Sequence, residues 1–535
     1  MRLSTAKLAT FALCLASSAA PALGFQFAEP FEPGLRWIHA ESLTSPAIPT
    51  RVSFAAGGEL VWVGTEVANK RLHLFAGPNF GVTDPVLTDV SVSGASYILD
   101  VKAGREADQL FALVQFPEPD EASRRTTVMR HDALAPASGA IFDDEWTYSF
   151  SFVANGLALM DVADQGQVVA VAVVQSSARF VRVLHLDGPS GAPLMTYDMQ
   201  SVLGLGALAL SGDGKVTAVC AESRLILLDQ WGGLLHDEAL SGPASTLALS
   251  QDGSRLIVGL VGSLLVYDFD GSAYQLVHTH TGGTNEAVKQ VAVSDDGQTY
   301  AGTWYRFLSV DQTRFEVYGG ATHTMLNQVL QQGSAGNFQN APVAVEMTAD
   351  GRRIAFASWG QGTDLPEVVL VERGVSEPLL EVDLPGSAMG IDLDPSGTQI
   401  ALVAKNLHAN QLGTTGEVRL YSTGERDLEL KSPVRVGGDL EVASIKPGAK
   451  LALFLVGQRA KSPIAMPGML GELHLARNNG LHVYGRVTDL NGRADLSVPV
   501  PAQSTMIGFE LAVQVANRVS GQIVFSDTVL DPLIF

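Results

Sequence analysis

The sequence predicts an all-β protein, in which a seven- or eight-bladed β-propeller is followed by a small C-terminal β-sandwich-like domain. A strand–turn–strand segment recurs on average about every 48 residues between positions 45 and 430. Charged residues make up only 17% of the chain, while 54 glycines can supply tight turns. Apolar residues in the repeats alternate or run continuously without a helical 3.6-residue period, which excludes a helical solenoid.

Each repeat reads as an apolar strand, a turn ending in Asp-Gly or a close variant, a second strand, a short turn and a third strand. The clearest copies are Leu208–Asp229, Leu247–Asp268 and Val291–Tyr318. Weaker copies are Val52–Phe75, Leu99–Asp132, Leu159–Asp187, Val345–Glu372 and Ile391–Tyr421. Glycine suits these turns because it tolerates a left-handed backbone. The turn glycines are Gly58, Gly104, Gly166, Gly214, Gly253, Gly297, Gly351 and Gly397.

Most repeats also contain a fourth, outer strand, such as Pro193–Met199, Tyr274–His280 and Pro378–Leu384. Four strands per unit with a period of 40–50 residues are typical of a β-propeller. Eight repeats predict eight blades, or seven if the irregular repeat that begins at Leu99 is not a full blade. We expect Leu35–Ala40 to complete the last blade, because an open ring would leave an unpaired edge.

The pattern LALSxDGxxLxVGxxxxLxVYD resembles the WD40-like and YVTN-type propeller repeats of exported bacterial proteins. The resemblance covers about residues 45–430 and implies the propeller fold. It implies little about function, because such propellers serve as ligand platforms, scaffolds and occasionally enzymes. The Gly-His and Trp-Asp dipeptides of eukaryotic WD40 repeats are absent.

The repeat pattern ends near residue 433, so we expect a propeller over residues 25–433 and a separate β domain over 434–535. The latter resembles a C-terminal module of exported, multi-domain bacterial proteins in PGAKLALFLVG, DLNGRADLSVPVP and MIGFELAVQV. Asn491-Gly492 lies between the predicted strands Leu481–Val487 and Ala494–Val500, which predicts a hairpin. Alternatively, Ser444–Val456 opens a ninth blade.

Residues 1–24 have the pattern of a cleaved signal peptide. Arg2 and Lys7 precede the apolar run Leu8–Ala16, and small residues then lead to a cleavage site before Phe25. We therefore expect export to the periplasm, the cell surface or the medium. No later segment reaches eighteen uninterrupted apolar residues, so no integral membrane segment is expected after cleavage. The net charge of −21 disfavours binding to nucleic acids.

The sequence lacks the common catalytic and cofactor motifs, including a Gly-x-Ser-x-Gly elbow, a phosphate loop and a haem-binding Cys-x-x-Cys-His. We accordingly expect no catalytic, cofactor-binding or metal-binding residues and no cofactor. Cys220 lies in an apolar run and is interpreted as a small buried hydrophobic residue. Removal of Cys14 with the signal peptide would leave it as the only cysteine.

Several residues suggest chemistry but have simpler explanations. His278 and His280 share one face of a strand and could bind a metal, yet an exposed outer strand is the preferred interpretation. On that interpretation, replacing both histidines should change stability little. In the acidic turns at Asp295-Asp296-Gly297 and Asp392-Leu393-Asp394, the carboxylates are expected to accept hydrogen bonds from their own backbone. The acidic segment Asp489–Asp495 could bind calcium, but a hairpin is the preferred interpretation. The tryptophans are assigned to packing between blades, with sugar stacking at the channel mouth as the alternative.

We expect an exported, non-catalytic platform that binds an unknown protein, glycan or small ligand across one face of the propeller. The alternative is a propeller hydrolase of the lactonase or metal-dependent type. That alternative requires histidines or carboxylates that converge at the central channel. The histidines nearest to plausible loops are His39, His236 and His323, and they come from scattered repeats.

Overall fold

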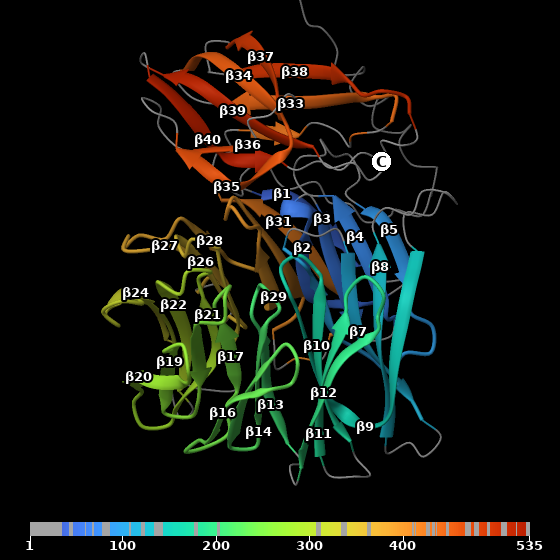
Figure 1. Cartoon of the computed structure of the whole chain (residues 1–535), viewed down its shortest axis with the longest axis vertical. Helices are drawn as coiled ribbons and strands as arrows, with labels where there is room; N and C mark the ends of the chain where they lie inside the picture. Colours follow the sequence, from blue (N-terminus) through green and yellow to red (C-terminus); the bar gives the residue numbers. More distant parts are fainter. Residues whose placement is uncertain are drawn as a thin grey trace, which may run out of the picture.

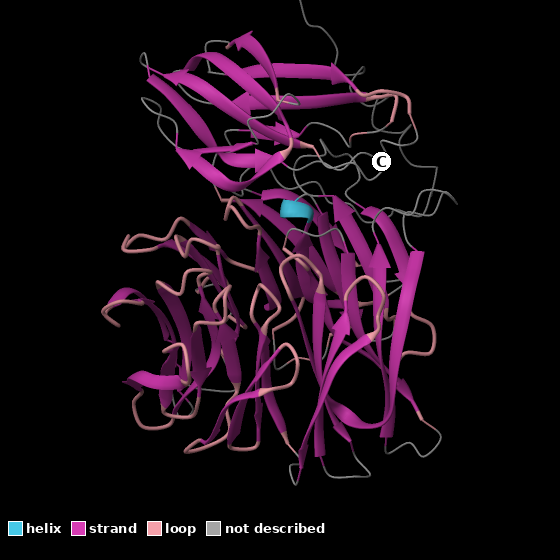
Figure 2. Cartoon of the chain, viewed as in Figure 1, coloured by secondary structure: helices cyan, strands magenta, loops and turns pink. Residues whose placement is uncertain are grey.

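The structure is a computed structural model in which nearly every element is a β-strand (Figure 2). It describes residues 35–530 except 42–45, 59, 67–68, 77–85, 106–108, 119–122, 133–142, 176–179, 201–203, 307–311, 333–339, 361–364, 409–410, 412, 424–427, 431–433, 435, 446–448, 466–471, 476–480, 489–492, 504–510 and 520–521. The expected signal peptide lies outside these residues. The one described helix is the short 3-10 turn η1 (Ala56–Gly58), and no helix in the described part could cross a membrane.

The described strands up to β31 form successive four-stranded units, here numbered 1 to 8, arranged in a ring (Figure 1). Unit 1 contains β2 (Ile48–Ala55), β3 (Leu60–Glu66), β4 (Arg71–Ala76) and β5 (Val86–Ser91). Unit 2 contains β6 (Tyr97–Ala103), β7 (Gln109–Pro117), β8 (Ser123–Asp132) and the first part of β9 (Asp143–Val162). Unit 3 contains the rest of β9, β10 (Val168–Gln175), β11 (Phe180–Asp187) and β12 (Pro193–Gln200). Unit 4 contains β13 (Leu205–Leu210), β14 (Val216–Ala221), β15 (Arg224–Asp229) and β16 (Leu234–Ala239).

The second half of the ring repeats this arrangement. Unit 5 contains β17 (Thr246–Leu249), β18 (Arg255–Gly259), β19 (Ser263–Phe269) and β20 (Tyr274–Thr281). Unit 6 contains β21 (Glu286–Val293), β22 (Thr299–Arg306), β23 (Gln312–Gly319) and β24 (Met325–Gln332). Unit 7 contains β25 (Pro342–Met347), β26 (Arg353–Ser358), β27 (Val368–Glu372) and β28 (Leu380–Val382). Unit 8 contains β29 (Ser387–Leu393), β30 (Gln399–Lys405), β31 (Gly416–Ser422) and β1 (Leu35–Ala40).

Units 2 and 3 share strand β9, so their strands form one continuous seven-stranded sheet. Residues Asp143–Ala154 of β9 pair with β8, whereas Val153 and Ala158–Val162 pair with β10. β9 is therefore the outer strand of unit 2 and the inner strand of unit 3. This fusion explains why the repeat is irregular in this part of the sequence.

The ring joins its last repeat to the N-terminal strand. Strand β1 pairs antiparallel with β31 as the outermost strand of unit 8, with His39 opposite Val418. It occupies the edge that the sequence analysis assigned to Leu35–Ala40. The inner strands β29 and β2 lie next to each other, and an apolar cluster that includes Trp37, Phe75 and Val403 fills the seam between units 8 and 1.

The repeated turns have the predicted left-handed glycine in every unit except unit 2, where Gly104 does not have positive φ. The glycines at positions 58, 166, 214, 253, 297, 351 and 397 all have positive φ, from 63° to 95°. In unit 5, the carboxylate of Asp252 accepts a hydrogen bond from the backbone N–H of Ser254, two residues later, at 2.9 Å. Asp213, Asp296 and Asp350 make the same contact in their own units. The expected outer strands in units 3, 5 and 7 are present as well.

The remaining strands form two facing sheets and a short two-stranded piece, consistent with the predicted β-sandwich. They are β32 (Leu428–Leu430), β33 (Asp439–Ile445), β34 (Ala449–Gly457), β35 (Arg459–Ala465), β36 (Glu472–Leu475), β37 (His482–Val487), β38 (Arg493–Pro499), β39 (Ala512–Val519) and β40 (Gln522–Leu530). One sheet has the order β32-β33-β38 and the other β37-β34-β39-β40, with β35 paired to β36. Because β32 pairs with β33, this part begins a few residues before the expected boundary at 433/434.

The predicted hairpin at Asn491-Gly492 is wrong in its pairing. The two flanking strands exist, but β37 pairs with β34 and β38 pairs with β33, so they belong to different sheets. The turn itself lies outside the described residues. Asn-Gly favours a tight reversal locally, but burial of two apolar sheet faces decides which strands pair. The segment Ser444–Val456 likewise belongs to these sheets and not to a ninth blade.

Apolar clusters fill the seams between neighbouring units. The largest cluster includes Trp62 and Leu74 of unit 1 and Leu110 of unit 2, and it continues into the C-terminal strands with Leu440 and Phe454. Figure 1 shows the C-terminal strands gathered at one side of the ring, next to the first strands of the chain. The ring and the C-terminal strands therefore share one hydrophobic core on this side.

Candidate functional site

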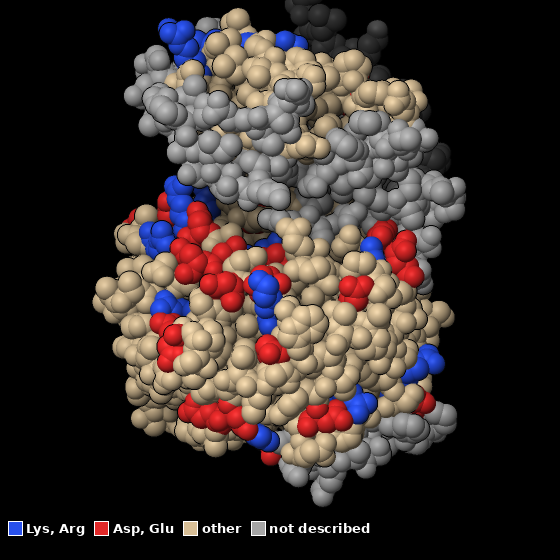
Figure 3. All heavy atoms as spheres, viewed as in Figure 1, with Lys and Arg blue, Asp and Glu red and all other residues tan. Residues whose placement is uncertain are grey.

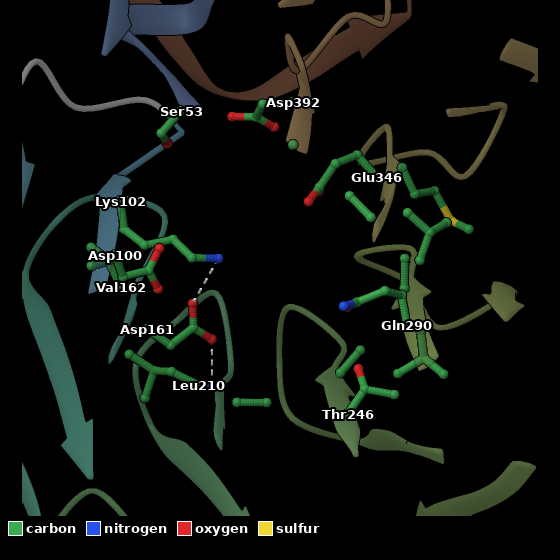
Figure 4. Close-up of a pocket in the computed structure, with 18 of the residues that line it drawn as sticks. Ser53, Asp100, Lys102, Asp161, Val162, Leu210, Thr246, Gln290, Glu346 and Asp392 are labelled. Carbon is green, nitrogen blue, oxygen red and sulfur yellow. Dashed lines mark hydrogen bonds and ion pairs between the residues drawn. The ribbon is translucent and has the colours of Figure 1, made fainter. Parts of the chain in front are cut away.

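A cavity of about 600 Å³ follows the axis of the ring. It is lined by the inner strands β2, β6, β9, β13, β17, β21, β25 and β29 and by the turns that follow them. Because alternate residues of a strand face opposite sides, every second residue of each inner strand faces the axis. Figure 4 shows such side chains around the central space.

One tier of the channel wall is charged on one side and apolar on the other. It consists of the residues two positions before each turn begins, so they occupy equivalent places in the units. In ring order these residues are Ser53, Lys102, Asp161, Ala209, Ala248, Ala292, Glu346 and Asp392. Units 4 to 6 contribute only alanines, whereas units 7, 8, 2 and 3 contribute charged groups. A ligand in this channel would meet a neutral wall on one side and ionisable groups on the other.

Two of the three carboxylates in this tier are used by the fold. Asp161 accepts a hydrogen bond from the backbone N–H of Leu210, in the next unit, at 2.8 Å (Figure 4). Asp392 accepts one from the backbone N–H of Phe54, also in the next unit, at 2.7 Å. Glu346 occupies the equivalent position in unit 7, yet it has no hydrogen bond or ion pair with any described residue. Its carboxyl group is therefore available to a ligand.

Enclosure by the ring changes the protonation of these groups. Burial raises the pKa of Glu346 to about 8, and the charge of Asp392 acts in the same direction. Burial also raises the pKa of Asp392 to about 6, although the N–H of Phe54 and the charge of Lys102 oppose this shift. The Lys102 ammonium lies 3.7 Å from Asp161, whose charge raises the lysine pKa. The enclosed carboxyl group of Glu346 thus keeps its proton to a higher pH than an exposed glutamate does.

Acidic residues outnumber basic residues along the channel. Asp100, Asp161, Asp164, Asp295, Glu346 and Asp392 line it, against the basic Arg51, Lys102 and Arg105. Acidic side chains also form several groups on the face of the molecule shown in Figure 3, with basic side chains next to them. Within the described residues, no group of three or more His, Cys, Asp or Glu side chains is placed to hold a metal ion.

The histidines considered in the sequence analysis do not meet at the channel. His39 lies on β1, 3.8 Å from Glu41, and His236 lies on β16, 3.0 Å from Glu238. Neither they nor His323 are among the described residues that line the cavity. The tryptophans are also absent from that lining: Trp62 and Trp304 are buried in the seams, and Trp231 is exposed on the outside of unit 4. Cys220 is a buried free cysteine, as predicted.

His278, His280 and His323 instead form a stack at the seam between units 5 and 6. The rings of His278 and His323 lie 4.5 Å apart and nearly parallel, and His280 lies 3.9 Å from the ring of Tyr318. The hydroxyl of Tyr300 is 2.7 Å from Nε2 of His280 and 3.1 Å from Nδ1 of His323. β20 is the outermost strand of its sheet, as predicted, but both of its histidines are half-buried rather than exposed.

This stack should make the stability of the ring pH-dependent. Burial and the neighbouring His278 and His323 lower the pKa of His280 to about 4. The folded state therefore binds fewer protons than the unfolded chain between about pH 6.5 and pH 4, so stability is lost as the pH falls through this range. Allowing for the partial exposure of His280, we expect a loss on the order of 1–2 kcal/mol. The free energy of unfolding in urea, measured at pH 7.5 and pH 5, tests this.

The variant His280→Gln should lose part of this pH dependence, because it removes the group that must be protonated. His482→Gln, at an exposed position on β37, is the matched control and should behave like the unchanged chain. If the free energy of unfolding of His280→Gln changed between pH 7.5 and pH 5 as much as that of the unchanged chain, the stack would not contribute to the pH dependence.

The charged residues of the channel were not predicted from the sequence. Asp392 was assigned to a turn, but it lies on β29 and faces the axis. Asp295 was assigned in the same way, yet its carboxylate reaches across to Arg105 at 2.9 Å. The sequence does contain a pattern that marks them: a charged residue interrupts an otherwise apolar inner strand two positions before the turn. These residues are Lys102 in DVKAG, Asp161 in LMDVA, Glu346 in VEMTA and Asp392 in IDLDP.

Comparisons with known proteins identify the fold and nothing finer. No protein-family model matches the chain, and no curated protein matches it. Among solved structures, the chain is similar to Saccharomyces cerevisiae Sqt1, with a TM-score of 0.50 and 10% sequence identity over 72% of this chain and 97% of that chain. This likeness supports a WD40-like β-propeller fold for the described ring.

Proposed function

We propose that this protein is a non-catalytic binding platform whose ligand places a positively charged organic group in the axial channel. Glu346 carries the proposal. It is an enclosed carboxyl group without a partner among the described residues, and it faces a cavity of about 600 Å³. Alkylammonium and alkylguanidinium groups fit this arrangement, because the charge can contact Glu346 while the carbon chain packs against Ala248 and Ala292.

The pH dependence of binding tests this proposal, with n-butylammonium as the probe. Because burial raises the pKa of Glu346 to about 8, binding must displace a proton at neutral pH. The affinity should therefore increase as the pH rises from 6 to 9, a range in which the probe stays charged. Isothermal titration calorimetry in two buffers of different ionisation enthalpy measures both the affinity and the number of protons released.

Glu346→Gln should abolish the binding and the proton release, since an amide cannot carry the negative charge. Glu381→Gln is the matched control, because this carboxylate lies on the exposed outer strand of the same unit. The proposal is wrong if both variants bind the probe equally well or if the affinity does not change with pH.

A second candidate is a hydrolase. One observation favours it: two carboxyl groups, Glu346 and Asp392, line the same channel, and burial raises the pKa of both. Two carboxyl groups of which one is protonated and the other ionised can act as acid and base on a bond between them. A set of lactone, ester and glycoside substrates at pH 7 would reveal such activity. Turnover that Glu346→Gln and Asp392→Asn both abolish would favour the hydrolase over the platform.

We also propose that the protein is exported and that its mature chain begins at Phe25. The proposal is supported by the basic start, the apolar run and the small residues that precede this position. Intact-mass analysis of protein recovered from outside the cytoplasm should give a chain that begins within a few residues of Phe25. Folded protein outside the cytoplasm that retains Met1 would contradict the proposal.

A further inference from the structure

Arg105 crosses one mouth of the channel. This mouth is surrounded by the turns that link the first and second strands of each unit. From unit 2, Nη1 of Arg105 reaches Oδ1 of Asp295 at 2.9 Å, and its Nε lies 3.9 Å from Oδ1 of Asp164. Asp295 belongs to unit 6, four units away around the ring, so this ion pair spans the opening.

The backbone around this mouth is held in place. The N–H of Asp164 donates to the carbonyl of Gly212 at 2.9 Å, and that of Asp213 to Gln251 at 2.9 Å. The chain of contacts continues from Gln251 to Asp295 at 3.1 Å and from Asp295 to Ala349 at 2.9 Å. Five consecutive turns are thus joined by backbone hydrogen bonds. On this side of the mouth the backbone is fixed, and movement of side chains is the simplest way to widen the opening.

Polar side chains lie at this opening, inside the ring of joined turns. A Cβ atom added to Gly212 would lie 1.7 Å from Oε1 of Gln251 and 2.5 Å from Oδ2 of Asp164. The polar ends of these two side chains therefore lie close above Gly212. Like Arg105, they line the channel at this opening. The Arg105 side chain remains 38% exposed, so its ion pairs are open to water and the guanidinium can swing away from the ring.

We propose that Arg105 is a gate. While its guanidinium group pairs with Asp295, the side chain lies across the turn-side mouth and narrows this route into the channel. Release of its guanidinium from Asp295 joins the two faces through the channel. This inference rests on the proposed function for its biological meaning, since the gate decides from which face a cationic ligand reaches Glu346. The gate itself is a property of the ring and can be tested without any ligand.

The test measures how fast a thiol inside the channel reacts. Ala248→Cys places that thiol in the channel wall, and the native Cys220, which is buried, reports on the integrity of the ring. Mass spectrometry follows the modification of both cysteines by a small cationic methanethiosulfonate. Adding Arg105→Ala should increase the reaction rate at position 248 several-fold while Cys220 stays unmodified, because a second route into the channel has opened.

Asp295→Asn should have the same effect in weaker form, because it leaves Arg105 in place but removes its charged partner. Arg352→Ala is the control, because that arginine pairs with Glu372 on the outside of unit 7. An unchanged rate in Arg105→Ala, or an equal increase in Arg352→Ala, would overturn the gate. Neither result depends on binding at Glu346, so failure of the gate and failure of the proposed function are distinguishable.

Discussion

A chain without residues 25–41 should unfold at a temperature many degrees below that of the full chain. Strand β1 would be lost, and with it the pairing that covers the outer edge of unit 8. Trp37 would be lost as well. It is 7% exposed and stacks on Phe75 of unit 1 at 5.3 Å, so it seals the seam at which the ring closes. Thermal unfolding followed by circular dichroism measures the effect.

A single substitution makes the same test sharper. Trp37→Ala should cost about 3–5 kcal/mol, the usual range for removing a large buried aromatic side chain. Trp231→Ala is the matched control, because that side chain is 75% exposed, and it should change stability by less than about 0.5 kcal/mol. Equal effects of the two substitutions in denaturant unfolding would show that β1 does not close the ring.

Truncation after Thr423 should also destabilise the ring, instead of leaving it intact as expected for an independent C-terminal domain. The reason is the shared hydrophobic cluster, in which Leu440 and Phe454 belong to the same core as Trp62 and Leu110. Removing the C-terminal strands would expose apolar surface on units 1 and 2, which costs about 25 cal/mol per Å². Differential scanning calorimetry should show a lower transition temperature for the truncated chain.

A core substitution in the C-terminal strands tests, without removing any residues, whether these strands and the ring unfold in one transition. Phe454→Ala should lower the same transition that reports on the ring, since Phe454 is fully buried in the shared cluster. Val487→Ala, at an 82% exposed position on β37, should leave it unchanged. Two separate transitions, of which Phe454→Ala moves only one, would support independent folding instead.

The parts of the fold that depend on local chemistry could be predicted from the sequence. Gly253 has φ of 71°, and Asp252 bonds the backbone two residues on, because a tight turn after an apolar strand requires both. The same local rule failed at Asn491-Gly492. Strands β37 and β38 are close in sequence but find their partners in β34 and β33, and only the packing of two sheets decides that.

The candidate site could not be predicted because it depends on ring geometry. Arg105 and Asp295 are 190 residues apart, and only closure of the ring places them across one opening. Glu346 and Asp392 likewise belong to different units, and their equivalent positions before a turn do not show by themselves that both face the axis. Once the repeat register is known, however, a charged residue two positions before a turn predicts a channel-facing group.

Localising a cation inside the channel tests the central claim most directly. Crystals soaked with 4-bromobenzylammonium, whose aryl bromide is not displaced by the amine, allow the bromine to be found by its anomalous scattering. The ammonium should lie beside Glu346, with the bromine against the wall that contains Ala248 and Ala292, and the signal should disappear in crystals of Glu346→Gln. Bromine bound only outside the channel, or bound equally in both crystals, would contradict the claim that this channel is the binding site.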